Sequence, residues 1–266
     1  RLRERTPLVK TRSSKQVELI EQADMSAIME AVNAIQATAW EVNTEVLSVL
    51  EDCWASGLEI GLPSSTPYKI PESPFPDIKK AALTEQQKKK FDDWKNEARI
   101  VHSLEKERVA KCFSVIRVLR MAKDYREKKF WYVYQCDFRG RIYSSVTGLS
   151  PQGADFGKAL VRFAEGKPLG ERGALWFCIH GANCYGVDKV SYKDRLQWVE
   201  DNKDYILAVG ADPLSNRDFW KSADKPWQFL AWCKEYCGYN EEGAEFISHL
   251  PIALDGTCNG LQNYSA

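Results

Sequence analysis

The chain has 266 residues, of which 44% are hydrophobic and 28% charged, and its formal net charge is zero. This composition is typical of folded globular proteins and excludes intrinsic disorder, while the length permits a sizeable core and more than one domain. No apolar run approaches the roughly 20 residues that a membrane-spanning helix needs, and no signal peptide is recognisable. We therefore expect a cytoplasmic protein with no membrane association.

The neutral total conceals an uneven distribution of charge. Between Lys79 and Arg141 there are 18 Lys and Arg against 9 Asp and Glu, a net charge of +9, so the rest of the chain carries −9. A basic segment beside an acidic remainder indicates an anionic partner on one side, or simply a solvated helix face. The eight cysteines form no C-x-x-C pair and the three histidines are far apart. That spacing predicts buried free thiols and argues against a structural zinc site.

The first half of the chain is predicted to be helical. Residues 1–56 contain apolar side chains at helical spacing, and residues 57–77, with two glycines and five prolines, predict an extended linker. Thr84 with Gln87 three residues later indicates a capping box at the start of a long helix or helix pair. Its later part, residues 108–129, has an apolar face that includes Phe113 and a basic face that suits a phosphate backbone.

The second half mixes strands and helices. Phe130–Cys136 and Ile142–Val146 are rich in aromatic and β-branched residues, which predicts two strands joined by a tight charged turn at Gly140. Leu250–Leu254 is a short apolar run that predicts a buried strand ending at Asp255. Helices are predicted over three further segments, residues 171–185, 192–209 and 218–236, and the last of these is expected to be interrupted at Pro226.

The final segment, LPIALDGTCNGLQNYSA over residues 250–266, is the most informative about chemistry. An acidic residue at the end of an apolar strand, followed by glycine, places a carboxylate on a rigid edge. Hard cations such as Mg²⁺ prefer carboxylate oxygens, and the backbone carbonyl of Gly256 could be a second ligand beside Asp255. Taken alone, however, an Asp-Gly pair is more often an ordinary turn.

Several segments together resemble one family. The string DGTCNGLQ at residues 255–262 closely resembles the first palm motif of phage-type single-subunit DNA-dependent RNA polymerases. The DFRGR turn at 137–141 looks like the D-x-x-G-R element of that family, and Pro151–Gly153 looks like its next landmark. The segments 180–184 (HGANC) and 186–190 (GVDKV) resemble a third. The segments occur in family order at family-like spacing, so the resemblance covers most of the chain and is strongest from residue 130 onward.

The resemblance implies a catalytic role for Asp255. In this family the corresponding aspartate binds two catalytic Mg²⁺ ions, and the next glycine, here Gly256, binds through its carbonyl. Related family-A DNA polymerases carry a bulky Glu five residues after the aspartate, which rejects a ribose; Gly260 occupies that place here and favours ribonucleotides. The family's second metal-binding aspartate lies beyond Ala266, so we expect an internal fragment of a polymerase, inactive alone.

The resemblance also implies contacts with nucleic acid and nucleotide. It places the 137–141 turn against the template and the RNA–DNA hybrid, and it directs Lys189 to the incoming triphosphate, with Lys158 as a weaker candidate for a backbone phosphate. The basic helix would face the hybrid without reading sequence. Each side chain has a simpler alternative as a solvated surface residue. The expected nucleic-acid-binding residues are Asp137, Arg139, Gly140, Arg141, Lys158, Arg117, Arg120 and Lys123.

We expect an α+β fold, with a helical thumb-like region over residues 1–129 and a partial palm with a small antiparallel sheet over residues 130–266. Asp255 should lie close to the 137–141 turn. The full-length protein is expected to be a monomeric DNA-directed RNA polymerase that uses Mg²⁺, with DNA template, nascent RNA and ribonucleoside triphosphates as partners. Two alternatives stay open. A non-catalytic nucleic-acid-binding module would not need Asp255 followed by glycines, and a family-A-like DNA polymerase would not place glycine at position 260.

Overall fold

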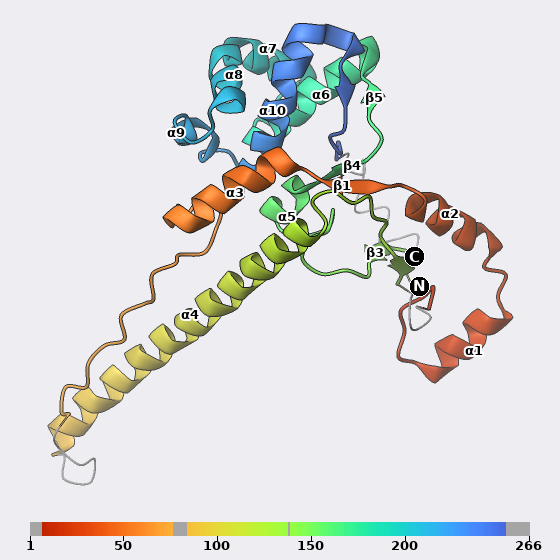
Figure 1. The fold of residues 1–266 in the computed structure, drawn as a ribbon. Helices are drawn as coiled ribbons and strands as arrows, with labels where there is room; N and C mark the ends of the chain where they lie inside the picture. Colours follow the sequence, from red (N-terminus) through yellow and green to blue (C-terminus); the bar gives the residue numbers. More distant parts are fainter. Residues whose placement is uncertain (1–6, 77–83, 138, 254–266) are drawn as a thin grey trace.

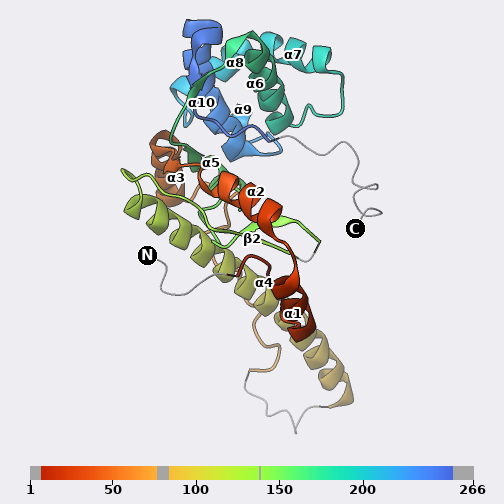
Figure 2. The same ribbon diagram turned by 90° about the vertical axis from the view of Figure 1, so that its right-hand side faces the viewer.

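The computed structural model describes residues 7–76, 84–137 and 139–253. Over these residues the chain is mostly helical, with three two-stranded antiparallel sheets, so the expected α+β class is confirmed. Within the same ranges, every helix falls short of the length or the apolar character that crossing a bilayer would require. Two helix groups flank the small sheets, and one long helix extends away from the rest of the molecule (Figure 1, Figure 2).

The N-terminal part interrupts its helices with a strand. The order of elements is α1 (Ser14–Gln22), α2 (Ser26–Gln36), β1 (Trp40–Val42) and α3 (Thr44–Ser56). Strand β1 pairs antiparallel with β4 (Val161–Phe163). The prediction of helix throughout residues 1–56 is therefore wrong at residues 40–42. An aromatic and a β-branched residue alternate around Glu41 and are both buried, the pattern of a strand packed on one face.

A long helix follows the proline-rich segment. Residues 57–76 contain neither helix nor strand, as expected, and run beside α4 (Glu85–Asp124), where the Trp94 indole N–H donates to the Pro71 carbonyl at 2.9 Å (Figure 1). The predicted capping box is present, because Thr84 accepts from the Gln87 backbone while the Gln87 side chain accepts from the Thr84 backbone. Two orphan donors of the helix N-terminus are thereby satisfied.

The faces of α4 differ in part from the prediction. Its last turns bury Val115, Val118, Leu119 and Ala122 against the body of the protein. The side chain of Phe113, expected on the apolar face, is 67% exposed. The helix ends at Asp124, short of the expected position 129.

Helix α10 (Pro226–Glu242) is central to the C-terminal helix group and packs against α5, α6 and α8 (Figure 1). The predicted helix over 192–209 is two helices that meet at Asn202. The interruption predicted at Pro226 is confirmed, because α9 ends at Trp220 and α10 begins at Pro226. The other elements are β2 (Tyr134–Cys136), β3 (Ile142–Ser144), α5 (Asp155–Ala159), β5 (Lys167–Pro168), α6 (Gly170–Tyr185), α7 (Tyr192–Asp201), α8 (Lys203–Ala211), α9 (Arg217–Trp220), a 3₁₀ turn η2 (Gly243–Glu245) and β6 (Ile247–Ser248).

The strand predicted at residues 250–254 is absent from the part of that segment that the structure describes. The last strand in the described part of the chain is β6, which pairs with β5, and residues 249–253 are irregular. Pro251 has no backbone N–H, so a ladder through this position would lack a donor.

Three tryptophans fill the core around α10. Trp220, Trp227 and Trp232 are fully buried, and each indole N–H donates to a backbone carbonyl of another segment, at Pro213, Ile60 and Phe177 respectively, over 2.7 to 2.8 Å. Because each buried N–H has a partner, the ring is buried without leaving a polar group unsatisfied. The seven cysteines in the described ranges are free thiols and five of them are buried, as expected.

The contact between α6 and α10 depends on Gly181. A Cβ at this position would lie 2.1 Å from Trp232 Cε2. Gly181→Ala should therefore reduce the free energy of unfolding by about 1–3 kcal/mol, as overpacking of a core does, measured by urea denaturation. Gly173→Ala in the same helix is the matched control, because its Cβ would find its nearest neighbour at 3.6 Å; an equal loss of stability in both variants would contradict this explanation.

Candidate functional site

The 137–141 turn is organised by the carboxylate of Asp137. It accepts hydrogen bonds from the backbone N–H groups of Arg139 and Arg141, both at 2.9 Å. The turn is closed by backbone bonds from Asp137 N–H to the Arg141 carbonyl and from Gly140 N–H to the Asp137 carbonyl. Gly140 has a φ of 76°, a left-handed conformation that glycine adopts without strain. The predicted turn at Gly140 is confirmed, and β2 and β3 pair on either side of it.

This arrangement displays two arginines on one exposed turn. Arg139 and Arg141 are both exposed, and the Arg139 guanidinium lies 3.7 Å from the Asp137 carboxylate. The hydrogen bond from the Arg141 N–H, with a second from the Arg139 N–H, holds the pKa of Asp137 below its usual value. Asp137 is thus ionised over the neutral range, and its contacts in the structure are those of a residue that shapes the turn.

The Pro151–Gly153 landmark is attached to this hairpin. The side-chain amide of Gln152 donates to the Ile142 carbonyl at 3.0 Å, and its oxygen accepts from the Ser144 N–H at 2.6 Å. Gly153 lets its own backbone lie close to the backbone of Gly148, because a Cβ at position 153 would lie 2.8 Å from the Gly148 carbonyl oxygen. Two of the segments that the sequence singled out are therefore one structural unit.

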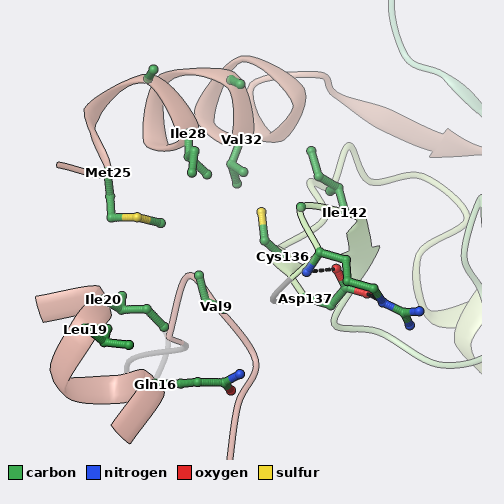
Figure 3. Close-up of a pocket in the computed structure, with 14 residues that line it drawn as sticks. Val9, Gln16, Leu19, Ile20, Met25, Ile28, Val32, Cys136, Asp137 and Ile142 are labelled. Atoms are coloured by element: carbon green, nitrogen blue, oxygen red, sulfur yellow. Dashed lines mark hydrogen bonds and ion pairs between the residues drawn. The ribbon is translucent and has the colours of Figure 1, made fainter. Parts of the chain in front are cut away.

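An apolar cavity of about 740 Å³ lies behind the turn. In Figure 3, Ile28 and Val32 on α2 face Val9 and Ile20 across it, while Asp137 lies at its edge. The lining is mainly aliphatic, and a phosphate would find few hydrogen-bond donors there. The arginine turn forms one rim of this cavity, and the exposed guanidinium groups are the part of the turn that suits an anion.

A second, smaller cavity gathers other predicted residues. Its volume is about 220 Å³, and it is lined by Lys158, His180 and Gln228 together with Pro151 and residues 250–253. The structure therefore brings Lys158 and two sequence landmarks to the segment that immediately precedes Asp255. Asp255, Gly256 and Gly260 lie outside the described residues. The expected closeness of Asp255 to the 137–141 turn therefore stays a prediction.

Ser248 and His249, which immediately precede the cavity-lining residues 250–253, are hydrogen-bonded on two sides. The Phe163 N–H of β4 donates to the His249 carbonyl at 2.9 Å. On the other side Glu235 of α10 accepts from the Ser248 hydroxyl at 2.5 Å and from the His249 N–H at 3.2 Å. Burial raises the pKa of Glu235. Sequence reasoning missed Glu235, because a single glutamate inside a helix carries no local signal of a partner elsewhere in the chain.

The other predicted basic residues are spread over separate surfaces. Lys189 is exposed between α6 and α7 and is not among the residues lining the cavity that contains Lys158. Arg117 on α4 donates to the Thr147 carbonyl at 2.8 Å, and Lys123 forms an ion pair with Glu51 at 2.8 Å. Arg120 on the same helix is exposed. Nucleic-acid contact by these side chains stays a prediction.

The described ranges contain no group of three or more His, Cys, Asp or Glu side chains arranged to hold a metal ion. His180, the buried histidine of the smaller cavity, has Cys184 Sγ at 3.5 Å from its Nε2. Burial, with a smaller contribution from the nearby Lys225 ammonium, lowers the pKa of His180 to about 4. The ring is therefore neutral at pH 7.

The shifted pKa of His180 predicts a pH dependence of stability. Unfolding exposes the ring, which then binds a proton below its ordinary pKa of 6.5, whereas the folded state binds one only near pH 4. The unfolded state is thus favoured as the pH falls through this window, and between pH 7 and pH 5 the loss is about 2 kcal/mol. Urea denaturation should show this loss in the parent protein and a smaller one in His180→Gln; identical pH profiles would refute the assignment.

The hydrogen bonds of Asp137 predict the behaviour of its variants. Asp137→Ala should increase amide hydrogen exchange at Arg139 and Arg141, because both N–H groups lose their acceptor. Asp137→Asn, which keeps one side-chain oxygen, should preserve most of the protection. The measurement is residue-resolved hydrogen exchange, with the Thr84→Ala variant at the distant start of α4 as the control. Unchanged exchange in Asp137→Ala would contradict the organising role.

Comparison with known proteins identifies the family. The family model described as DNA-dependent RNA polymerase matches residues 167–266. The DNA-directed RNA polymerase of Enterobacteria phage T3 is 39% identical over 263 residues, and the T7 RNA polymerase of Escherichia phage T7 is 36% identical; each match covers 97% of this chain and 29% of the relative. The mitochondrial DNA-directed RNA polymerase of Neurospora crassa is 36% identical over 93% of this chain and 17% of its own length. The chain spans less than a third of these relatives, and it belongs to the family of phage-type single-subunit DNA-dependent RNA polymerases.

Proposed function

We propose that this chain is part of a DNA-directed RNA polymerase that transfers ribonucleotides from nucleoside triphosphates to a growing RNA. The named activities of the T3 and T7 relatives support this proposal. The structural observation that carries it is the cavity in which Lys158 and His180 meet residues 250–253. His180 belongs to one family landmark, and Pro151, which also lines the cavity, belongs to another; residues 250–253 lead toward Asp255 in the sequence. The chain alone is expected to be inactive.

Asp255 and the carbonyl of Gly256 are the proposed ligands of two Mg²⁺ ions. A carboxylate and a carbonyl are hard oxygen donors of the kind that Mg²⁺ prefers. Bound there, the cations would lower the pKa of the attacking RNA hydroxyl and neutralise charge on the triphosphate. The described residues offer no alternative cluster of ligands, so the proposal depends on Asp255. Gly260, without a side chain, leaves space for a ribose 2′-hydroxyl.

The basic side chains supply the electrostatic part of the proposal. Arg139 and Arg141, displayed by the Asp137 turn, would contact phosphates of the template strand and the hybrid, because guanidinium forks match phosphate geometry. Lys158 would contact a backbone phosphate near the cavity. Lys189 would meet the triphosphate of the incoming nucleotide.

The exposed basic side chains of α4, including Arg117, Arg120 and Lys123, would lie along the hybrid and position it without reading its sequence. The domain division is part of the same proposal, with residues 1–129 thumb-like and residues 130–266 palm-like. The β1–β4 pairing joins residues on both sides of that boundary. We further propose that the full-length protein acts as a monomer in the cytoplasm, with DNA template, nascent RNA and ribonucleoside triphosphates as its partners.

Replacement of the proposed metal ligand tests the function. In the full-length protein, Asp255→Ala should reduce primer extension with ribonucleotides and Mg²⁺ by roughly 10³-fold or more, because electrostatic stabilisation of the transferring phosphoryl group is lost. Binding of template–primer, measured by fluorescence anisotropy, should change little.

Asp201→Ala, at an exposed carboxylate of α7, is the control and should extend primers normally. Parallel reactions with deoxyribonucleotides separate the RNA polymerase proposal from a DNA polymerase. Normal extension by Asp255→Ala, or a preference for deoxyribonucleotides in the parent protein, would contradict the proposal.

A further inference from the structure

The loop between α6 and α7, residues 186–191, is held by a single guanidinium group. Arg195 lies in the second turn of α7, and its Nε donates to the Val190 carbonyl at 3.1 Å while one terminal nitrogen donates to the Asp188 carbonyl at 2.5 Å. The other terminal nitrogen donates to the side-chain oxygen of Asn183 on α6 at 2.8 Å. The two carbonyls belong to the residues on either side of Lys189, so the backbone at Lys189 is gripped on both flanks.

The guanidinium group is itself fixed in place. Its central carbon lies 5.1 Å from the centre of the Tyr192 ring, a cation–π arrangement, and that ring meets Trp176 of α6 edge to face at 5.4 Å. Together with the bond to Asn183, these contacts connect Arg195 to two places on α6. A planar group with five N–H donors in a rigid fork can make all these bonds at once, whereas a lysine ammonium cannot.

The ends of the loop are also anchored. Gly186, with a φ of 114°, ends α6, and a Cβ there would lie 2.8 Å from an oxygen of Asp224. At the other end the Ser191 hydroxyl oxygen accepts from the Asp194 N–H at 3.2 Å and caps α7. Between these anchors, the Arg195 bonds set the path of the chain through Asp188, Lys189 and Val190.

Lys189 is the residue that this framework presents to solvent. Its side chain is exposed, and no carboxylate within ion-pair distance is found for it among the residues that the structure describes. A fixed backbone below an ammonium group lowers the entropy lost when that group meets an anion. The Arg195 charge, a few residues away, adds to the attraction for a polyanion.

We propose that Arg195 is a positioning residue for nucleotide binding: it holds the backbone around Lys189 so that the lysine ammonium meets the triphosphate of an incoming ribonucleotide. This inference rests on the function proposed above, in which Lys189 contacts the triphosphate. Arg195 acts through the loop, and loss of its fork should weaken nucleotide binding more than it slows the chemical step. Binding of inorganic pyrophosphate, which also consists of linked phosphate groups, should be weakened by the same change.

The test uses steady-state primer extension by the full-length protein. Arg195→Ala and Arg195→Lys should each raise the KM for ribonucleoside triphosphates roughly 5- to 20-fold, the change expected from one to two lost hydrogen bonds, with kcat within about twofold. Lys189→Ala should raise KM as well. The double variant Lys189→Ala/Arg195→Ala should be no worse than Lys189→Ala, because the fork has nothing left to position. Arg217→Ala, at an exposed arginine that also donates to a backbone carbonyl, is the matched control and should leave KM unchanged.

The outcomes separate this inference from the proposed function. An unchanged KM in Lys189→Ala would overturn this inference and the proposed triphosphate contact of Lys189, because the lysine would then not contact the triphosphate; the polymerase proposal itself is tested separately through Asp255→Ala. A raised KM in Lys189→Ala with a normal KM in Arg195→Lys, or fully additive effects in the double variant, would overturn the positioning role alone. The thermal unfolding midpoint separates misfolding from a local effect, and Arg195→Lys, which keeps the charge, remains decisive if Arg195→Ala does not fold.

Discussion

A three-residue strand ties together the segments that lead to both parts of the proposed site. Trp40 in β1 exchanges two backbone hydrogen bonds with Phe130, at 2.8 and 2.9 Å, just before the arginine hairpin. β1 also pairs with β4, whose Phe163 in turn bonds to His249 on the path to Asp255. The Trp40 ring lies 4.7 Å from the Phe163 ring and 5.6 Å from the Tyr132 ring, so aromatic contacts reinforce the pairing. The strand therefore connects the segment before the arginine hairpin with the segment that leads to Asp255.

Two partly buried carboxylates connect α10 to the same framework. Asp155 of α5 accepts from the Trp227 N–H at 2.8 Å and from the Gln228 N–H at 3.3 Å, at the N-terminus of α10, where a negative charge is favoured. Glu235, in the middle of the helix, holds Ser248 and His249. Burial raises the pKa of both carboxyl groups, so their ionised forms are costly and gain their stability from these bonds. Carboxylates of this kind fix the relative positions of the segments that they bond more than they increase the free energy of unfolding.

Local signals in the sequence predicted the local structure well. The capping box at Thr84, the glycine turn at Gly140 and the proline-rich segment were all identified correctly, because each is determined by neighbouring residues. Strand β1 was missed, because its pairing partner lies about 120 residues away and its own stretch has helical spacing. The exposed Phe113 was placed on the wrong face for the same reason, since the sequence does not show where α4 leaves the body of the protein. The convergence of Lys158, His180 and residues 250–253 in one cavity was not predicted, because these residues are far apart in the sequence and no local pattern indicates that they lie together.

In each of the two loops that present basic side chains, one charged side chain holds the backbone by hydrogen bonds, and that side chain has opposite charge in the two loops. In the arginine turn the organiser is an anion, Asp137, whose charge would offset part of the attraction between the two arginines, Arg139 and Arg141, and the phosphates proposed to bind them. In the Lys189 loop the organiser is a cation, Arg195, which adds to that attraction. In the proposed function, a template backbone would bind and then move on, and partial neutralisation would suit a contact that is made and released repeatedly. The proposed triphosphate ligand is small and highly charged, so extra positive charge close to Lys189 would favour its capture from solution.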